Sequence, residues 1–164
     1  LFLPASEGAS FPAVRGGGGA VASAESASTE VGLEILRAGG NAVDAAVATA
    51  LALAVVHPQA GNLGGGGFAV VRMHDQLMSL DFREVAPAAA TRDMYLDDEG
   101  RPWKDASSIG PLAAGVPGSP IGLYELHQRF GALAWPRVVG PARQLASEGF
   151  LITTRLHDSL VEEQ

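Results

Sequence analysis

The sequence predicts an α/β domain in which helices stack on a sheet that has too few strands to be complete. Three features predict this class: two adjacent helical segments, a hairpin of two apolar runs, and two amphipathic helices after a loop-rich stretch. With 164 residues, of which 47% are hydrophobic, the chain can bury a core and has the size of one domain or part of one.

The first helical segment has recognisable ends. Ser26 or Ser28 is expected to cap its start, because a serine hydroxyl can accept a bond from a free backbone N–H of the first turn. Val31 and Ile35 then fall at helical spacing, and Gly39-Gly40 supplies a left-handed exit. We therefore expect a helix between these serines and glycines.

A second helix is predicted over residues 42–56. Asn41 is expected to cap it, and Asp44 stands where a carboxylate can answer the cap. The segment is apolar on nearly all sides, which predicts a core helix with neighbours around it. Its fifteen residues are too few to span a bilayer, which needs about 20. Pro58 is expected to end it.

Two strands and two further helices complete the expected organisation. Residues 68–73 form a continuous apolar run, so we expect a strand covered on both faces, followed by a turn and a second strand over 77–82. Residues 83–117 are rich in loop signals. Helices are expected over residues 120–130 and 136–148, the second ending at Gly149.

The two ends of the chain also carry expectations. Residues 1–20 contain two prolines and a run of four glycines, which predicts a flexible leader before a domain over residues 21–164. The first residue is not Met, and the last residues look like a helix that is starting. The sequence is therefore expected to be a fragment of something longer.

Composition excludes several classes of function. The net charge of -7 argues against a nucleic-acid binder, because such proteins need a basic face. The chain has no cysteine, which excludes disulfides, thiolate zinc sites and cysteine nucleophiles. Its four histidines include no pair at the spacing that places two ligands on one helix face. No metal and no cofactor are predicted.

The glycine run at positions 64–67 has three interpretations. A phosphate loop must open a helix, whereas these glycines lead into a strand and lack the Lys-Ser/Thr that would follow. The run could instead be a tight start of the strand that needs positive φ. In the third interpretation, Asn62 and the glycines form a wall of an active site.

Arg83 and Ser119 each have a plain and a functional interpretation. Arg83 could form a salt bridge with Asp81 or Glu84, or it could grip a ligand carboxylate through two parallel hydrogen bonds. Ser119 lacks the glycine pattern of a nucleophile elbow and precedes a proline, so capping a helix is the favoured role.

Several ordered segments together resemble one family, the gamma-glutamyltranspeptidases. The resemblance runs from about Val21 to Phe150 and makes the carboxylate-clamp interpretation of Arg83 the favoured one. The segments that carry it are Gly39-Gly40-Asn41-Ala42-Val43-Asp44-Ala45-Ala46-Val47, His57-Pro58-Gln59-Ala60-Gly61-Asn62-Leu63-Gly64-Gly65-Gly66-Gly67-Phe68, Asp81-Phe82-Arg83-Glu84, Ala86-Pro87 and Thr91-Arg92-Asp93-Met94.

The resemblance implies an N-terminal nucleophile hydrolase with an αββα sandwich, of which this chain is an incomplete part. Family members are precursors that cut themselves into a large and a small subunit. The nucleophile is the threonine freed at the start of the small subunit, whose α-amine can act as its base. No catalytic residue is therefore expected in this chain. Thr153-Thr154 comes too early to be the cleavage point and is interpreted as a helix cap.

The resemblance also implies a substrate and partners. A γ-glutamyl group, as in glutathione, passes to water, an amino acid or a peptide. Arg83 is the expected ligand of the donor's α-carboxylate, and Glu84 and Asn62 are secondary candidates for holding or orienting that site. The small subunit of the same precursor is the expected protein partner. Family members are typically exported, so a periplasmic or secreted location is expected.

Two alternatives remain open at this point. A relative on the same fold could act on glutaryl groups, as a cephalosporin acylase does, or on poly-γ-glutamate; both kinds of substrate carry a carboxylate. The other alternative is a noncatalytic binding or structural fragment produced by truncation.

Overall fold

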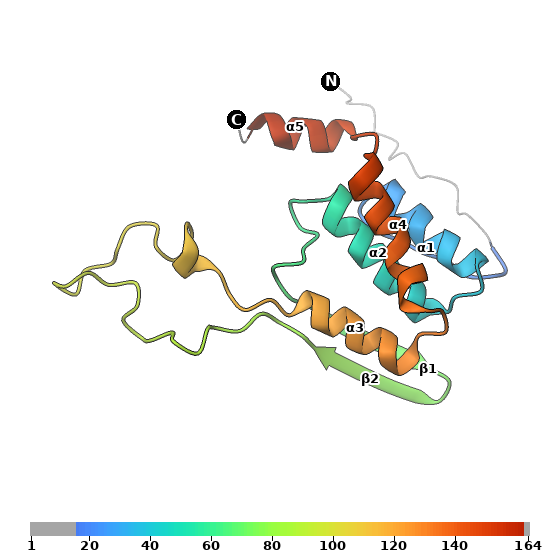
Figure 1. Cartoon of the computed structure of the whole chain (residues 1–164), viewed down its shortest axis with the longest axis horizontal. Coiled ribbons are helices and arrows are strands. Elements are labelled where there is room, and N and C mark those ends of the chain that lie inside the picture. Colours follow the sequence, from blue (N-terminus) through green and yellow to red (C-terminus); the bar gives the residue numbers. More distant parts are fainter. Residues whose placement is uncertain (1–15, 163–164) are drawn as a thin grey trace, which may run out of the picture.

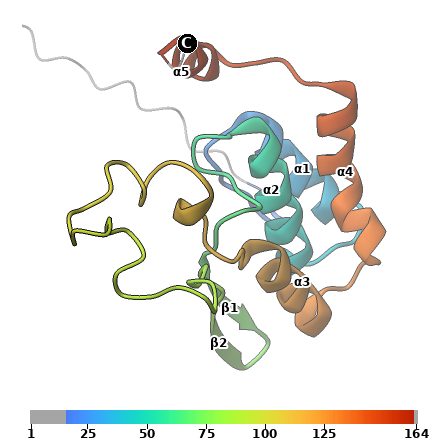
Figure 2. The same cartoon turned by 60° about the vertical axis from the view of Figure 1, so that its left-hand side comes forward.

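The computed structural model describes residues 16–162. A central helix, α2, packs against α1, α3 and α4, and the hairpin lies beside α3 with one face against the helical core (Figures 1 and 2). The elements are α1 (Ser26–Arg37), α2 (Ala42–Val56), β1 (Phe68–Met73), β2 (Gln76–Asp81), the short 3₁₀ helix η1 (Pro111–Ala113), α3 (Ser119–Phe130), α4 (Trp135–Glu148) and α5 (Thr154–Glu162).

Helix α1 starts differently from the sequence-based expectation. The N-cap residue is Glu25, and no side chain caps the helix, so the prediction of a cap at Ser26 or Ser28 is wrong. The buried Ser28 hydroxyl instead donates to the Glu25 carbonyl at 2.7 Å, because it lies within the first turn and cannot reach the free N–H groups. The predicted exit is confirmed, with Gly39 at φ +89°.

Helix α2 has the predicted cap and the predicted central position. The Asn41 Oδ1 atom accepts from the backbone N–H groups of Val43 and Asp44, and an Asp44 oxygen accepts from the Asn41 N–H at 2.9 Å. Val47, with an exposed fraction of 0%, lies at the centre of the core, where α2 meets residues of α1, α3 and α4. The core helix is confirmed.

Asp44 also connects α2 to the turn between α3 and α4. Its side chain is fully buried and accepts the backbone N–H groups of Ala132 and Leu133 at 3.0 and 3.3 Å. The His127 Nε2 atom lies 3.6 Å from the same carboxylate and 2.8 Å from the Leu133 carbonyl. One carboxylate therefore fixes the start of α2 and the path of the chain after α3.

The two strands form the predicted antiparallel hairpin, in which Phe68 pairs with Asp81 and Met73 with Gln76. The prediction that β1 is covered on both faces is wrong. Phe68 and Val70 are 67% and 77% exposed, whereas the alternate residues pack against the helical core. An apolar run does not say which face meets a neighbour, and within residues 16–162 the helices cover only one face.

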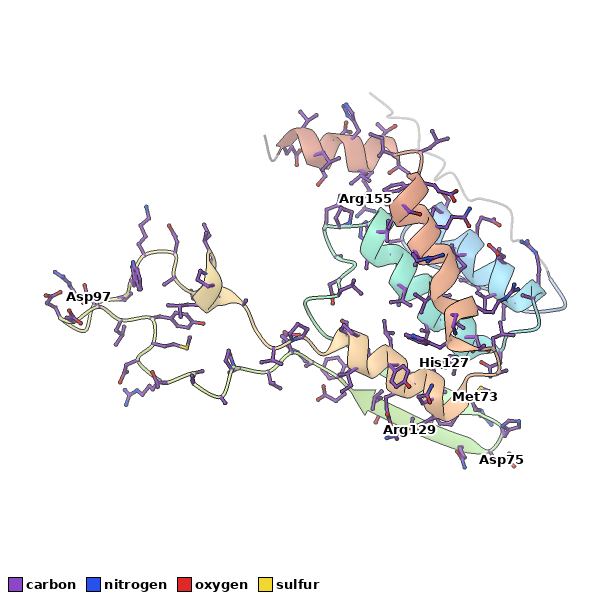
Figure 3. All side chains as sticks on the ribbon, viewed as in Figure 1. Met73, Asp75, Asp97, His127, Arg129 and Arg155 are labelled. Atoms are coloured by element: carbon purple, nitrogen blue, oxygen red, sulfur yellow. The ribbon has the colours of Figure 1, made fainter. Side chains whose placement is uncertain are left out.

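The rest of the described chain follows the expected organisation. Residues 83–117 form a long loop that extends away from the helices, and Asp97 lies near its far end (Figure 3). Gly149 ends α4 at φ +85°, and the Thr153 hydroxyl accepts the Leu156 N–H at 3.2 Å at the start of α5. Within the described residues, no helix is long and apolar enough to cross a membrane.

The predicted leader falls mostly outside the described part of the chain. Residues 1–15 of that segment are not described, and residues 16–20 are exposed and belong to no helix or strand. The predicted domain over 21–164 is described up to residue 162.

Candidate functional site

Arg83 lies just beyond β2, where the hairpin ends and the long loop begins. Its backbone N–H donates to Asp81 Oδ1 at 3.0 Å, and its Nη2 atom donates to Glu84 Oε1 at 3.1 Å. The side chain is 59% exposed, and no other acceptor for its guanidinium is found among residues 16–162. The neighbouring ion pair is therefore present, and it leaves most of the guanidinium donors free for a ligand.

The Phe68 ring lies beside this guanidinium. The Arg83 Cζ atom is 6.0 Å from the ring centroid, which is within range of a cation–π attraction worth about 0.5–1 kcal/mol at an exposed site. Phe68 thereby favours one orientation of the arginine side chain, above the exposed face of the hairpin.

Glycines from separate segments surround the backbone at Arg83. A Cβ atom on Gly66 would lie 2.5 Å from Arg83 Cα, which is closer than real Cβ contacts come. A Cβ on Gly118 would overlap the Phe82 carbonyl, and one on Gly122 would overlap the Phe82 ring. The chain at Phe82 and Arg83 is therefore held by close backbone contacts that no side chain permits.

This arrangement excludes two interpretations of the glycine run. None of Gly64, Gly65, Gly66 and Gly67 has positive φ, so a strand start that needs positive φ is wrong. The phosphate-loop interpretation also fails, because the run lies between α2 and β1 and opens no helix. Gly66 is instead the residue that allows the loop to approach the backbone of Arg83 closely.

Asn62 lies on the same loop as these glycines. Among the described residues, it forms no hydrogen bond with Arg83. Its Oδ1 atom accepts from the Gly65 N–H at 3.1 Å and from the Ser119 hydroxyl at 2.5 Å. Gly118 is the N-cap of α3, and no side chain caps this helix, so the prediction that Ser119 is a helix cap is wrong. Sequence reasoning missed this bond because the two residues are 57 positions apart.

Glu84 completes the local charge distribution. Its own backbone N–H, followed by the hydrogen bond from Arg83, lowers the pKa of the Glu84 carboxyl below its usual range, against a small opposing effect of burial. Glu84 is therefore ionised at neutral pH and occupies one donor of the arginine. An arriving carboxylate can use the remaining donors or displace Glu84.

The described residues provide hydrogen-bonding groups for a ligand, but they include no hydroxyl paired with a histidine base for acyl transfer. Ser119 donates to an amide oxygen, and no hydroxyl among residues 16–162 lies within hydrogen-bond distance of a histidine ring. The two buried histidines are already paired, His57 with Glu25 and His127 with Asp44. No group of three metal-ligating side chains is found in this part of the chain.

Comparisons with known proteins agree with the motif pattern. Residues 28–164 match the family model described as Gamma-glutamyltranspeptidase. A glutathione hydrolase proenzyme of Pseudomonas aeruginosa is 51% identical over 138 residues, which cover 84% of this chain and 25% of that protein. The chain thus spans about a quarter of the length of that relative.

Solved structures give the same result. The gamma-glutamyltranspeptidase of Helicobacter pylori has a TM-score of 0.88 at 43% identity, covering 92% of this chain and 44% of that chain. The enzyme of Pseudomonas nitroreducens, complexed with L-DON, has a TM-score of 0.84 at 47% identity, covering 89% and 44%.

A cephalosporin acylase of Bacillus halodurans is a more distant neighbour, with a TM-score of 0.68 at 31% identity, covering 84% of this chain and 26% of that chain. These proteins share the fold of N-terminal nucleophile hydrolases, and the described residues form a mixed helix-and-strand part of it. The match over residues 28–164 and the 51% identity show that the chain belongs to the gamma-glutamyltranspeptidase family.

Proposed function

We propose that the protein containing this chain transfers γ-glutamyl groups, with glutathione as a donor and with water, an amino acid or a peptide as the acceptor. The observation that carries this proposal is Arg83, an exposed guanidinium with free donors on a backbone held by close glycine contacts. The relatives named glutathione hydrolase support it.

In this proposal the chain supplies donor binding and the rest of the protein supplies the chemistry. A threonine at the start of the small subunit attacks the γ-carbonyl, and its own α-amine takes the hydroxyl proton. An oxyanion hole on the same subunit stabilises the tetrahedral intermediate. The amide bond of the donor then breaks as the α-ammonium group returns its proton to the leaving amine, which leaves a γ-glutamyl–enzyme ester. The acceptor cleaves this ester, takes the γ-glutamyl group and gives a proton back to the threonine oxygen. Cleavage of a proenzyme into the two subunits would precede turnover.

The residues of this chain divide the binding work. Arg83 binds the α-carboxylate of the donor through its free N–H groups. Glu84 holds the guanidinium in place before the donor arrives, and Asn62 shapes the glycine loop beside it. A periplasmic or secreted location is part of the same proposal, because members of the family are typically exported.

A panel of p-nitroanilides on the parent protein tests the assignment. The γ-glutamyl compound carries both an α-carboxylate and an α-amine, the glutaryl compound lacks the amine, and the 4-aminobutyryl compound lacks the carboxylate. Fastest turnover of the γ-glutamyl compound is expected. Preference for the glutaryl compound would favour an acylase instead, and no turnover by the matured protein would favour a noncatalytic one.

Arg83→Ala and Arg83→Lys test the clamp itself. Each lost charged hydrogen bond costs about 1.5–3 kcal/mol, so the loss of even one should raise KM for the γ-glutamyl donor roughly 10- to 150-fold, and the alanine variant should show at least this rise. The 4-aminobutyryl donor should be unaffected. Arg92→Ala is the matched control, because Arg92 is a 95% exposed arginine beside its own carboxylate partner, Asp93. An unchanged KM in both Arg83 variants would refute the clamp.

A further inference from the structure

The Ser119 hydroxyl is buried at the first residue of α3, and the residue is only 4% exposed. Its one hydrogen-bond partner among residues 16–162 is the Oδ1 atom of Asn62, at 2.5 Å. This buried hydroxyl donates its hydrogen bond to a side chain 57 positions away. The bond joins two segments that no secondary structure connects. The start of α3 is thereby tied to the glycine loop.

Asn62 receives two donors on one atom. The Gly65 N–H reaches Oδ1 at 3.1 Å beside the Ser119 hydroxyl, while Asn62 Nδ2 faces the Ala60 carbonyl at 3.4 Å. The oxygen must therefore point toward α3, and the amide is held in one orientation.

The carbonyl of Gly65 is held from the same side. It accepts the backbone N–H groups of Gly118 and Ser119 at 2.8 and 3.0 Å, two donors that α3 could not satisfy internally. Gly65 is thus fixed through both its N–H and its C=O, and Ser119 takes part in both halves of this arrangement.

The next residue transmits this position to the arginine. Gly66 lies so close to Arg83 that a Cβ on it would be 2.5 Å from Arg83 Cα. The ladder pair between Gly67 and Phe82, with the Phe82 N–H donating to the Gly67 carbonyl at 3.0 Å, fixes the register between loop and strand. A shift of the loop would therefore shift the backbone of Arg83.

We propose that Ser119 is a positioning residue, which acts through Asn62 and Gly65 on the backbone of Arg83. It fixes that backbone in the position from which the guanidinium reaches the donor carboxylate. This inference rests on the proposed function of Arg83. Without the hydroxyl, Asn62 keeps one donor and Gly65 keeps its carbonyl bonds, so the loop loosens without unfolding.

The test is the KM of the parent enzyme for two donors. Ser119→Ala should raise KM for γ-glutamyl p-nitroanilide about 5- to 10-fold, in keeping with the loss of one hydrogen bond at the binding site, and should leave the 4-aminobutyryl compound unchanged. Ser119→Thr keeps the hydroxyl and should restore the KM. Ser147→Ala is the control, because Ser147 bonds a carbonyl of its own helix.

Two further variants keep the test decisive. Asn62→Ala removes the acceptor of both Gly65 and Ser119 and should give a selective rise in KM at least as large, with the double variant no worse than Asn62→Ala alone. In an Arg83→Ala background, Ser119→Ala should have no further effect. Equal losses for both donors, or no change in KM, would overturn the positioning role. No change on Arg83→Ala itself would instead overturn the carboxylate-binding role of Arg83, on which this inference rests.

Discussion

At the residue scale, the guanidinium of Arg83 pairs with a neighbouring carboxylate and keeps most of its donors free. Glu84 accepts a hydrogen bond from one N–H group of the guanidinium, and the Phe68 ring lies beside the guanidinium. Because Glu84 is the adjacent residue and the pair is exposed, the ion pair is weak. An arriving carboxylate can therefore replace Glu84 as the partner of the guanidinium. Arg83 is preoriented by weak partners and stays available.

The titration of Glu84 should report this pairing. Its lowered pKa stabilises the folded state above the usual glutamate range, and that contribution is lost as pH falls through the folded value. Arg83→Gln should raise the Glu84 pKa only part of the way to the usual range, because the largest cause is Glu84's own backbone N–H. Carbon NMR of the carboxyl measures it.

Asp97 is the internal control in the same spectrum. Its pKa is lowered first by the backbone N–H of Arg101 and also by the Arg101 side chain, so it should not respond to Arg83→Gln. A Glu84 midpoint that also stays unchanged would show that Arg83 does not hold that carboxylate in solution.

Gly66 provides a second prediction at this scale. Gly66→Ala should raise KM for the γ-glutamyl donor by at least tenfold, because the new methyl group meets the Arg83 backbone at 2.5 Å and must displace it. Gly64→Ala is the matched control: it lies in the same loop, and its methyl group would meet nothing within 4 Å. Equal KM values for the two variants would contradict the close contact.

At the element scale, Asp44 joins three helices through backbone groups. Asp44→Ala removes an acceptor of the N–H groups of Asn41, Ala132 and Leu133 and leaves them without this charged partner at a partly buried place. The free energy of unfolding should fall by about 3–5 kcal/mol. Hydrogen exchange of the Ala132 and Leu133 amides should accelerate strongly. Asp75→Ala, at the exposed hairpin turn, should leave these amides protected.

The elements show why part of the fold could be predicted from sequence. The Asn41 cap and the Gly149 end involve residues within one turn of each other, so local chemistry decides them. The covered face of β1 depends on which helices pack there, and the run from Phe68 to Met73 does not contain that information. Ser28 failed as a cap because its place in the turn, which sequence does not fix, decides what its hydroxyl reaches.

The candidate site divides in the same way. Arg83 and Glu84 are adjacent, so their pairing could be expected. The bond between Asn62 and Ser119 crosses the fold and leaves no local signal, and the contact of Gly66 with Arg83 is visible only once the loop and strand are placed together. In the sequence, Asn62 and Ser119 appear only as two polar residues beside glycine-rich turns, which does not indicate that they meet.

At the scale of the whole molecule, the hairpin leaves one apolar face open. Phe68, Val70 and Leu77 are 67%, 77% and 74% exposed, and each strand of the two-stranded sheet has an edge without a partner among residues 16–162. Exposed apolar area with free strand edges promotes association.

The isolated chain should therefore self-associate with increasing concentration. Val70→Lys should reduce that association, because it places a charge in the middle of the open face. Sedimentation velocity measures the effect. Lys104→Ala, far away on the loop, is the comparison and should associate as the original chain does. A monomer at all concentrations would show that the open face of the hairpin does not mediate self-association.

The support of Arg83 has a consequence for protein engineering. The motif around the arginine is four residues long, yet the groups that hold it in place come from Asn62, Gly66, Ser119 and Gly122. Grafting the four-residue motif onto the hairpin of another scaffold would move the charge without its foundation. A transplant that preserves binding must carry the glycine loop and the first turn of α3 with it, as one unit of about sixty residues.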